Sequence, residues 1–163
     1  MPTPTYTPLA TVTLGSSAAS VTFSSIPATY RDLVLVVNAK NTVGANYNSL
    51  ARLNGDTGNN NPSIFMMGNS SGAVGVIRNV DGAGQIGYSN SSSNSTIIAQ
   101  FMDYSATDKH KTILSRSNAE AERVSAHAIR WTNTAAITSI AVLIEGGATW
   151  ATGGRFDLYG ILA

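Results

Sequence analysis

At 163 residues and 17.0 kDa, the chain is long enough for a single domain with a substantial buried core. Its ten Lys and Arg residues are scattered singly and its net charge is +1, which argues against a nucleic-acid partner and against charge-driven membrane binding. The absence of cysteine excludes disulfides and thiolate chemistry, and no apolar run reaches the ~20 residues of a membrane-spanning helix.

The N-terminal segment is rich in proline and has no features of a secretory signal. Three of its first eight residues are Pro2, Pro4 and Pro8, which cannot donate to a β-ladder and favour extended backbone. We therefore predict an extended arm over residues 1–8, either disordered or laid along a partner. Residues 9–163 are predicted to form one soluble β domain, made in the cytosol.

Alternating apolar and polar residues begin after the arm. Residues 9–14 and 19–24 each alternate with period two, and Gly15 to Ser17 separates them. This pattern predicts a β-hairpin with one buried face. The following segment, Ser25 to Arg31, is too short for more than one helical turn and is expected to lead the chain into the next strand.

The densest apolar run of the chain is Leu33 to Val37, five consecutive branched residues. Such a run indicates a strand buried on both faces or at the centre of a sandwich. Further strands are expected at spacings near the ~8 to 12 residues of a sandwich or barrel. They are predicted at residues 49–53, 63–67, 73–79, 96–104, 111–116, 123–131, 137–144 and 155–161.

Polar segments separate these strands. Residues 54–62 and 68–72 have turn composition, and the Ser/Asn tract at 89–95 is expected on an exposed rim. Only residues 117–123 have helix-friendly composition, and seven residues do not support a helix alone. The sequence therefore predicts an all-β fold.

Two glycine-containing motifs match catalytic or cofactor patterns in spacing only. The segment from Gly68 to Gly72 has the spacing of a nucleophile elbow around Ser70, with His110 or His127 as its only histidine partners. The segment from Gly82 to Gly87 has the spacing of a dinucleotide fingerprint. Both patterns require a following helix, and none is expected, so we interpret both as strand and loop sequence.

Three acidic or histidine-containing patterns are also better explained by structure. Asp56 begins an Asp-Thr-Gly triplet of the aspartic-protease type, but its Asn- and Gly-rich neighbours indicate a solvated turn. Asp103, Asp108 and His110 are close enough in sequence for a metal site but lie in a predicted loop without fixed ligand geometry. His127 shares a face with apolar residues and is expected to be a hydrogen-bonded interior or interface histidine. We predict no catalytic residue, no metal ligand and no cofactor.

Four segments in one order carry a family resemblance. They read IPATYRDLVL at residues 26–35, ARLNGDTG at 51–58, WTNTAAITSI at 131–140 and GRFDLYGI at 154–161. Together they resemble a family of small structural proteins of tailed bacteriophages, including cyanophages. The resemblance extends from about Ala10 to the C-terminus. It implies a jelly-roll-like antiparallel β-sandwich located in the virion, with no catalytic residues to carry over.

The resemblance implies two roles. The first is a capsid decoration or cement protein, expected to be a homotrimer that bridges major capsid protein subunits or other virion proteins. The second is a tail fibre or receptor-binding domain that recognises a host glycan through Ser/Asn/Gly-rich loops and stacking by Tyr47, Tyr88 or Trp150. The low content of charged residues, 12%, gives a neutral surface suited to side-by-side packing and favours the first role. A hydrolase would need a carboxylate pair, and the sequence offers none.

Overall fold

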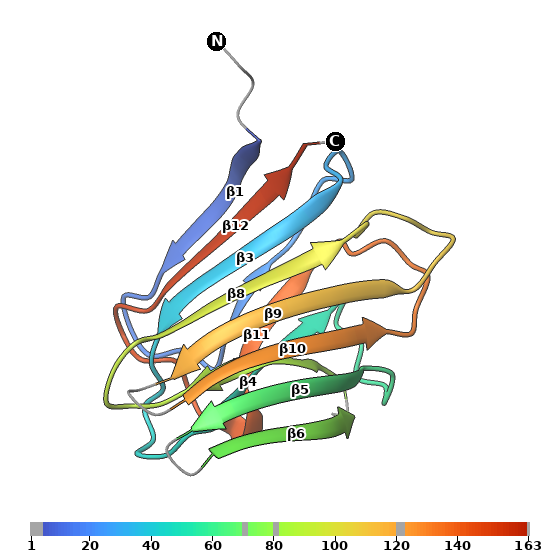
Figure 1. Ribbon diagram of the computed structural model, residues 1–163. Coiled ribbons are helices and arrows are strands. Elements are labelled where there is room, and N and C mark those ends of the chain that lie inside the picture. Colours follow the sequence, from blue (N-terminus) through green and yellow to red (C-terminus); the bar gives the residue numbers. More distant parts are fainter. Residues whose placement is uncertain (1–4, 70–71, 80–81, 120–122, 163) are drawn as a thin grey trace.

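The computed structural model shows an all-β protein built from two antiparallel sheets packed face to face (Figure 1). It describes residues 5–69, 72–79, 82–119 and 123–162. The larger sheet has eight strands, in the spatial order β1 (Tyr6–Thr13), β12 (Arg155–Ile161), β3 (Asp32–Ala39), β8 (Ser95–Met102), β9 (Lys111–Ala119), β10 (Arg123–Trp131), β5 (Pro62–Asn69) and β6 (Gly72–Asn79). The smaller sheet has four, in the order β2 (Ser20–Phe23), β11 (Ile140–Ile144), β4 (Tyr47–Leu53) and β7 (Gly84–Ser89).

The strand order is that of a jelly roll with two added hairpins. Without the hairpins β5–β6 and β9–β10, the sheets become β1-β12-β3-β8 and β2-β11-β4-β7. This is the eight-stranded, double Greek-key arrangement of a jelly roll. The added strands extend one edge of the larger sheet, beyond β8 (Figure 1). The predicted all-β antiparallel sandwich is confirmed.

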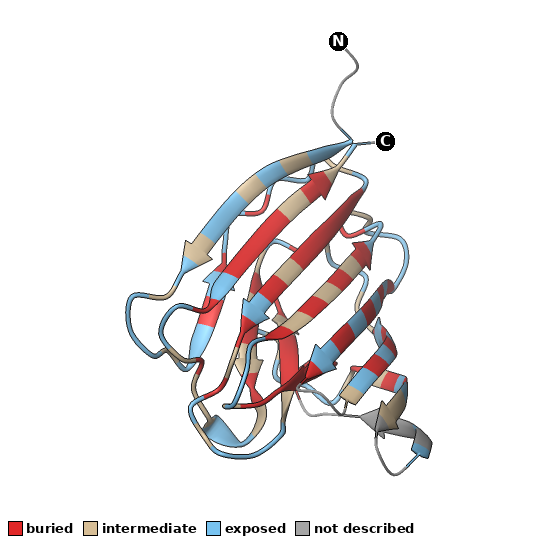
Figure 2. Ribbon diagram, turned by 60° about the vertical axis from the view of Figure 1, so that its left-hand side comes forward, coloured by how far each residue is buried: buried red, intermediate tan, exposed pale blue. Residues whose placement is uncertain are grey.

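The strand predicted from the densest apolar run is β3, at the centre of the jelly-roll half of the larger sheet. Leu33, Leu35 and Val37 are fully buried in the core between the sheets, and Val34 on the opposite face is also buried. Burial alternates along the neighbouring strands β8, β9 and β10 (Figure 2). One face of the larger sheet therefore forms the core, and its other face is the outer surface of the molecule.

The predicted hairpin near the N-terminus is wrong, although both of its strands exist. β1 pairs with β12 in the larger sheet, whereas β2 pairs with β11 in the smaller one. The chain crosses from one sheet to the other between them, so the two strands never meet as neighbours. Alternation identifies a strand with one buried face, but it carries no information about the strand's partner.

Part of the predicted N-terminal arm belongs to a strand of the larger sheet. Residues 1–4 lie outside the described residues, and Tyr6 to Pro8 already belong to β1. β1 is an edge strand, with a register shift between Pro8 and Ala10. An edge strand tolerates proline because only one of its sides makes ladder hydrogen bonds.

The turn that precedes β3 is held in place by two tyrosines. The hydroxyl of the buried Tyr104 donates a hydrogen bond to the carbonyl oxygen of Pro27. The ring of Tyr30 lies directly over Gly160 of β12, where an added Cβ would be 2.4 Å from the Tyr30 Cγ atom. The missing side chain at Gly160 allows this close approach, which seats the turn against the sheet.

Other strand predictions differ from the structure mainly at their ends. The predicted segments 123–131 and 155–161 match β10 and β12. The predicted strand at 137–144 begins only at Ile140, and β7 was not predicted. The Ser/Asn tract at 89–95 is only partly on the exposed rim, since Ser92, Ser93 and Asn94 are exposed whereas Ser89, Asn90 and Ser95 are buried. Among the described residues, no helix is long and apolar enough to cross a membrane, and the only helical element is the three-residue 3-10 turn Glu145–Gly147.

Candidate functional site

The two glycine motifs lie in strands and turns. The segment from Gly68 to Gly72 begins at the end of β5 and ends at the first residue of β6, and Ser70 lies outside the described residues. The two histidines are separated in environment, with His110 exposed in a loop and His127 buried in β10. No helix follows this motif, so the strand-to-helix turn of a nucleophile elbow is not formed.

The glycines of the second motif allow the two sheets to approach closely. Gly84 and Gly87 belong to β7, so this segment continues as a strand and does not open a helix. An added Cβ would lie 2.8 Å from the Cγ2 atom of Ile129 at Gly84, and 2.8 Å from the Cβ atom of Ser117 at Gly87. Packing of β7 against the added strands therefore explains these glycines without a nucleotide.

Asp56 organises a loop at one end of the sandwich. Its carboxylate accepts hydrogen bonds from the backbone N–H of Gly58 at 2.9 Å, the Nδ2 atom of Asn60 at 2.7 Å and the indole Nε1 of Trp131 at 2.8 Å. These hydrogen bonds, that from Asn60 above all, lower the pKa of Asp56 below its usual value. The expected turn is confirmed, and it also ties the loop after β4 to β10.

The residues considered for a metal site do not come together as a ligand set. Asp103 forms an exposed ion pair with Lys109 at 3.3 Å. Across the described ranges, no group of three or more His, Cys, Asp or Glu side chains is arranged to hold a metal ion.

A buried polar chain lies between the added strands and β7. Ser117 Oγ and Ser125 Oγ are 2.7 Å apart, and Ser125 Oγ is 2.9 Å from the Nε2 atom of His127. The imidazole stacks on Phe65 with a 5.4 Å separation of ring centroids, and its Nδ1 atom has no hydrogen-bond partner in the described part of the chain. Burial lowers the pKa of His127 to about 4. Of the two alternatives expected from the sequence, a hydrogen-bonded histidine in the interior or at an interface, the structure shows the interior one.

This chain of hydroxyls and imidazole lacks the features of a catalytic dyad. All three side chains are buried, so a substrate has no access to either serine. Among the described residues no carboxylate orients the imidazole, because the Nδ1 atom that would donate to it has no partner there. We interpret the chain as structural.

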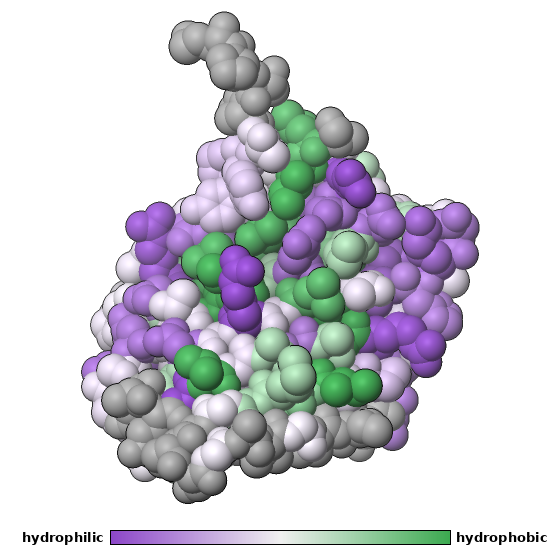
Figure 3. All heavy atoms as spheres, in the orientation of Figure 1, coloured by the Kyte–Doolittle hydropathy of each residue, from purple (hydrophilic) through white to green (hydrophobic). Residues whose placement is uncertain are grey.

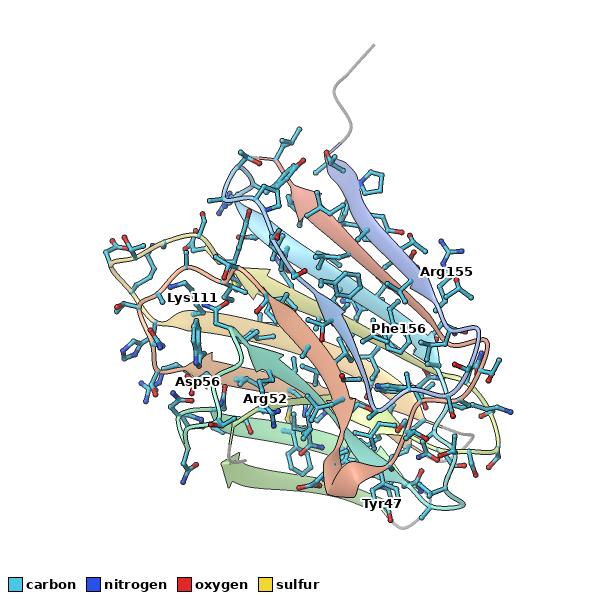
Figure 4. All side chains as sticks on the ribbon, turned by 180° about the vertical axis from the view of Figure 1, so that it is seen from behind. Tyr47, Arg52, Asp56, Lys111, Arg155 and Phe156 are labelled. Atoms are coloured by element: carbon cyan, nitrogen blue, oxygen red, sulfur yellow. The ribbon has the colours of Figure 1, made fainter. Side chains whose placement is uncertain are left out.

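Sequence analysis missed one buried cation. Lys111, at the start of β9, is fully buried, and its Nζ atom donates to the carbonyl oxygens of Lys109 at 2.8 Å and Thr134 at 3.1 Å. Burial lowers the pKa of its ammonium group. Lys111 and Asp56 lie at the same end of the sandwich (Figure 4). The sequence gives no signal that this lysine is buried, because it stands at a strand end and is the last residue of a Lys-His-Lys sequence.

The aromatic residues proposed to stack on sugars are not displayed on the surface. Trp150 is fully buried and donates its indole N–H to the carbonyl oxygen of Val142, and Tyr88 is buried beside Phe65. Tyr47 is half-buried and packs against the core. A sugar-stacking platform made of these three side chains is therefore excluded.

The most prominent surface feature is an apolar band on the outer face of the larger sheet. It consists of two adjacent rows that cross five strands in register, as the pairings of β3, β8, β9, β10 and β5 show. We define the apolar band by its eight aliphatic members: Val34, Val36, Ile98, Leu114, Ala126, Ala128, Ile64 and Met66. Figure 3 shows hydrophobic residues gathered over the middle and lower part of this face.

Several members of the apolar band are strongly exposed. The exposed fractions are 57% for Ile64, 66% for Met66 and 45% for Leu114. Large aliphatic side chains seldom project together into solvent unless a partner covers them. The rows on either side are more polar, with Asn38, Thr96 and Asn118 along one edge, and Asp32, Thr112 and Arg130 along the other, although each row also holds one exposed apolar side chain, Val124 and Met102 respectively.

The apolar band encloses a hollow of about 520 Å³. Val34 and Ile98 line it from the jelly-roll strands, and Ile64, Met66 and Leu114 line it from the added strands. Arg116 is the only charged residue among those lining it, and no described residue forms a hydrogen bond or ion pair with its side chain. The face therefore offers shape, apolar surface and one available cation, which suits binding and gives no group for catalysis.

Comparison of the chain with protein-family models, with curated proteins and with solved structures finds no significant match. The candidate site therefore rests on the geometry described above.

Proposed function

We propose that the chain is a structural protein of a bacteriophage virion, and that it acts as a capsid decoration or cement protein. In this role it stabilises the head by bridging major capsid protein subunits. Its partners are other virion proteins and copies of itself, and the proposal assigns it no catalytic step. The observation that carries the proposal is the exposed apolar band on the rigid outer face of a jelly-roll sheet.

Three features support this role. The family resemblance of the four ordered segments is to phage structural proteins. The jelly roll is an architecture that viral capsid proteins use widely. A contact that buries aliphatic groups stabilises an assembly by roughly 25 cal/mol per Å² of apolar surface, so many copies of a small contact would add up over a whole head.

The alternative is a tail fibre or receptor-binding domain that recognises a host glycan. Exposed hydroxyl groups in the Ser/Asn tract favour it, since Ser92 and Ser93 lie on the surface. The burial of Tyr88 and Trp150 weakens it, because these rings were two of its three expected stacking platforms.

Locating and counting the chain in the virion tests the proposal. We expect a cryo-electron microscopy map of the particle to show hundreds of copies on the head. Quantitative mass spectrometry of purified particles should give a ratio of this chain to the major capsid protein that agrees with that copy number. A handful of copies at the tail would support the alternative role instead. Absence of the chain from purified particles would overturn both.

Stability of the head provides a second, functional readout. Heads that lack the protein should lose their DNA at a lower temperature than complete heads, and purified protein added back should restore the difference. Thr112→Glu is the matched control for Leu114→Glu in the add-back, because both residues are exposed on the outer face of β9 and only Leu114 belongs to the apolar band. Equal rescue by both variants would show that the band makes no contact with the head.

A further inference from the structure

We propose that a second copy of this chain, called here the partner subunit, docks on the apolar band through a two-fold axis parallel to the strands and between β9 and β10. The proposal rests on the proposed function only in treating the apolar band as an assembly surface. The size of the face, the register of its side chains and its charge all suit such a pairing. Its test needs no virion.

The face has the area that a stable pair requires. The axis between β9 and β10 superposes the six strands from β3 to β6, which have eight or nine residues each. At ~4.8 Å between strands and ~3.3 Å per residue, they cover about 29 Å by 26 Å, or about 750 Å². Stable protein interfaces bury about 800 Å² on each partner.

The side chains of the face are complementary in size under this axis. The rotation keeps each row of residues and exchanges β9 with β10, and β8 with β5. In one row, Leu114 then faces Ala128 of the partner subunit, because these two residues are paired across β9 and β10. In the other row, Arg116 faces Ala126 of the partner subunit. A large side chain meets a small one at each position, which allows the two surfaces to interdigitate.

The same two-fold arrangement places the most exposed end of the band over the hollow of the partner subunit. Ile64 and Met66 project from β5 and are the most exposed of the aliphatic side chains in the band. Under the exchange of β5 with β8, Met66 lies over Ile98 of the partner subunit, which is only half-exposed and lines the hollow. By symmetry, each copy both fills a hollow and has its own hollow filled.

Electrostatics allow the pairing. The net charge of +1 per chain gives little repulsion between two copies. Among the described residues that line the hollow, only Arg116 is charged. Its long aliphatic stem can lie across the small Ala126 of the partner subunit while its guanidinium group stays hydrated at the rim of the hollow.

The test is the mass of the full chain in solution and its dependence on one residue of the band. We expect sedimentation equilibrium to give twice the 17.0 kDa chain mass at micromolar concentrations. Leu114→Glu places a carboxylate opposite an alanine in both halves of the interface and should raise the dissociation constant about 100-fold or more. Thr22→Glu, exposed on β2 in the smaller sheet and therefore outside the paired face, should change it less than about 3-fold.

Both variants alter exposed side chains, so their thermal unfolding in dilute solution should match that of the unmodified chain. A chain that stays monomeric at hundreds of micromolar would overturn the proposal. A mass of three chains, as the family resemblance implies, would overturn the two-fold pairing. A pair that Leu114→Glu leaves intact would do the same. If the chain is a monomer but binds heads through the band, the proposed function stands and the self-pairing is overturned.

Discussion

The eight jelly-roll strands and the four strands of the added hairpins are packed by different chemistry. The main core between the sheets is aliphatic and aromatic, and Trp150 within it donates its indole N–H to the backbone carbonyl oxygen of Val142. The added strands contribute Ile113, Ile129 and Trp131 to this core at one end. At their other end they enclose a second cluster, in which Phe65 and Tyr88 surround the neutral His127.

This difference separates the framework from the parts that carry binding features. The jelly-roll core contains no titratable group that changes charge near neutral pH, so it should be insensitive to pH. The added strands hold the pH-sensitive His127 on their inner face and the exposed half of the apolar band on their outer face. Extension of a jelly roll by two hairpins has therefore supplied the surface that we propose for assembly.

The largest expected effect comes from a cavity in the framework. Leu35 is fully buried at the centre of β3, and Leu35→Ala should reduce the free energy of unfolding by about 4 kcal/mol, equally at pH 7 and pH 5. Urea unfolding followed by tryptophan fluorescence measures this. Leu162→Ala is the matched control, because Leu162 is 37% exposed, and should cost less than about 1 kcal/mol. A pH-dependent loss in Leu35→Ala would show that the two regions are not separate.

The next effect is the pH response of the second cluster. The pKa of His127 in the folded protein, about 4, lies below the ordinary value of 6.5, so only the unfolded chain gains this proton between those values. The stability contributed by neutral His127 is complete above pH 6.5 and is lost as the pH falls towards 4, by about 3 kcal/mol. In His127→Gln the free energy of unfolding, measured by urea titration, should therefore fall by about 3 kcal/mol less than in the unmodified chain between pH 6.5 and pH 4. Parallel pH profiles for the two proteins would contradict the assignment.

A third prediction concerns the contact between the Tyr30 ring and Gly160 of β12. Gly160→Ala would place a Cβ atom 2.4 Å from the Tyr30 ring, and should cost about 2 kcal/mol because the ring must move from its seat. In a Tyr30→Ala background the same change should cost under about 0.5 kcal/mol. This double-mutant cycle, measured by thermal or urea unfolding, reports the contact directly. Additive effects would mean that Tyr30 does not hold the turn against β12.

The smallest expected effect comes from a hydrogen bond that joins the jelly-roll strands to the added strands. Asp56→Ala removes the acceptor that links the loop after β4 to Trp131 of β10, and should cost about 1 kcal/mol. Because hydrogen bonding lowers the pKa of Asp56, its contribution is present above its usual value of 3.8 and is lost as the pH falls below it. Asp108→Ala, in an exposed loop, provides the control and should be close to neutral. A similar loss in both variants would indicate a general charge effect.

Local sequence was sufficient for most strands and insufficient for their arrangement. The run from Leu33 to Val37 is recognisable because all five residues are branched and apolar, and the last strand is recognisable from its apolar Phe156, Leu158 and Ile161. β7 was missed because glycine and polar residues make up much of it, and its burial arises from close packing of the added strands over Gly84 and Gly87. The hairpin error arose because β1 pairs with a strand more than 140 residues away.

The apolar band was not predicted, although the sequence contains one signal for it. Ile64, Phe65, Met66 and Met67 are consecutive, so β5 has to present apolar groups on both faces. The same segment was interpreted only as a short strand. The rest of the band depends on the register of β8, β9 and β10, which brings single alternating residues from distant segments into two rows, and no local pattern contains that register.

The pairing of β1 with β12 also determines how the molecule is completed. Bringing these strands together closes the longest loop in the fold, whose entropic cost rises with the logarithm of its length, so this contact should form late in folding. As an edge strand with many exposed side chains, β1 should also be the first to fray, and its amide hydrogens should exchange faster than those of β3. When β1 opens, β12 becomes a temporary free edge to which another chain could add a strand.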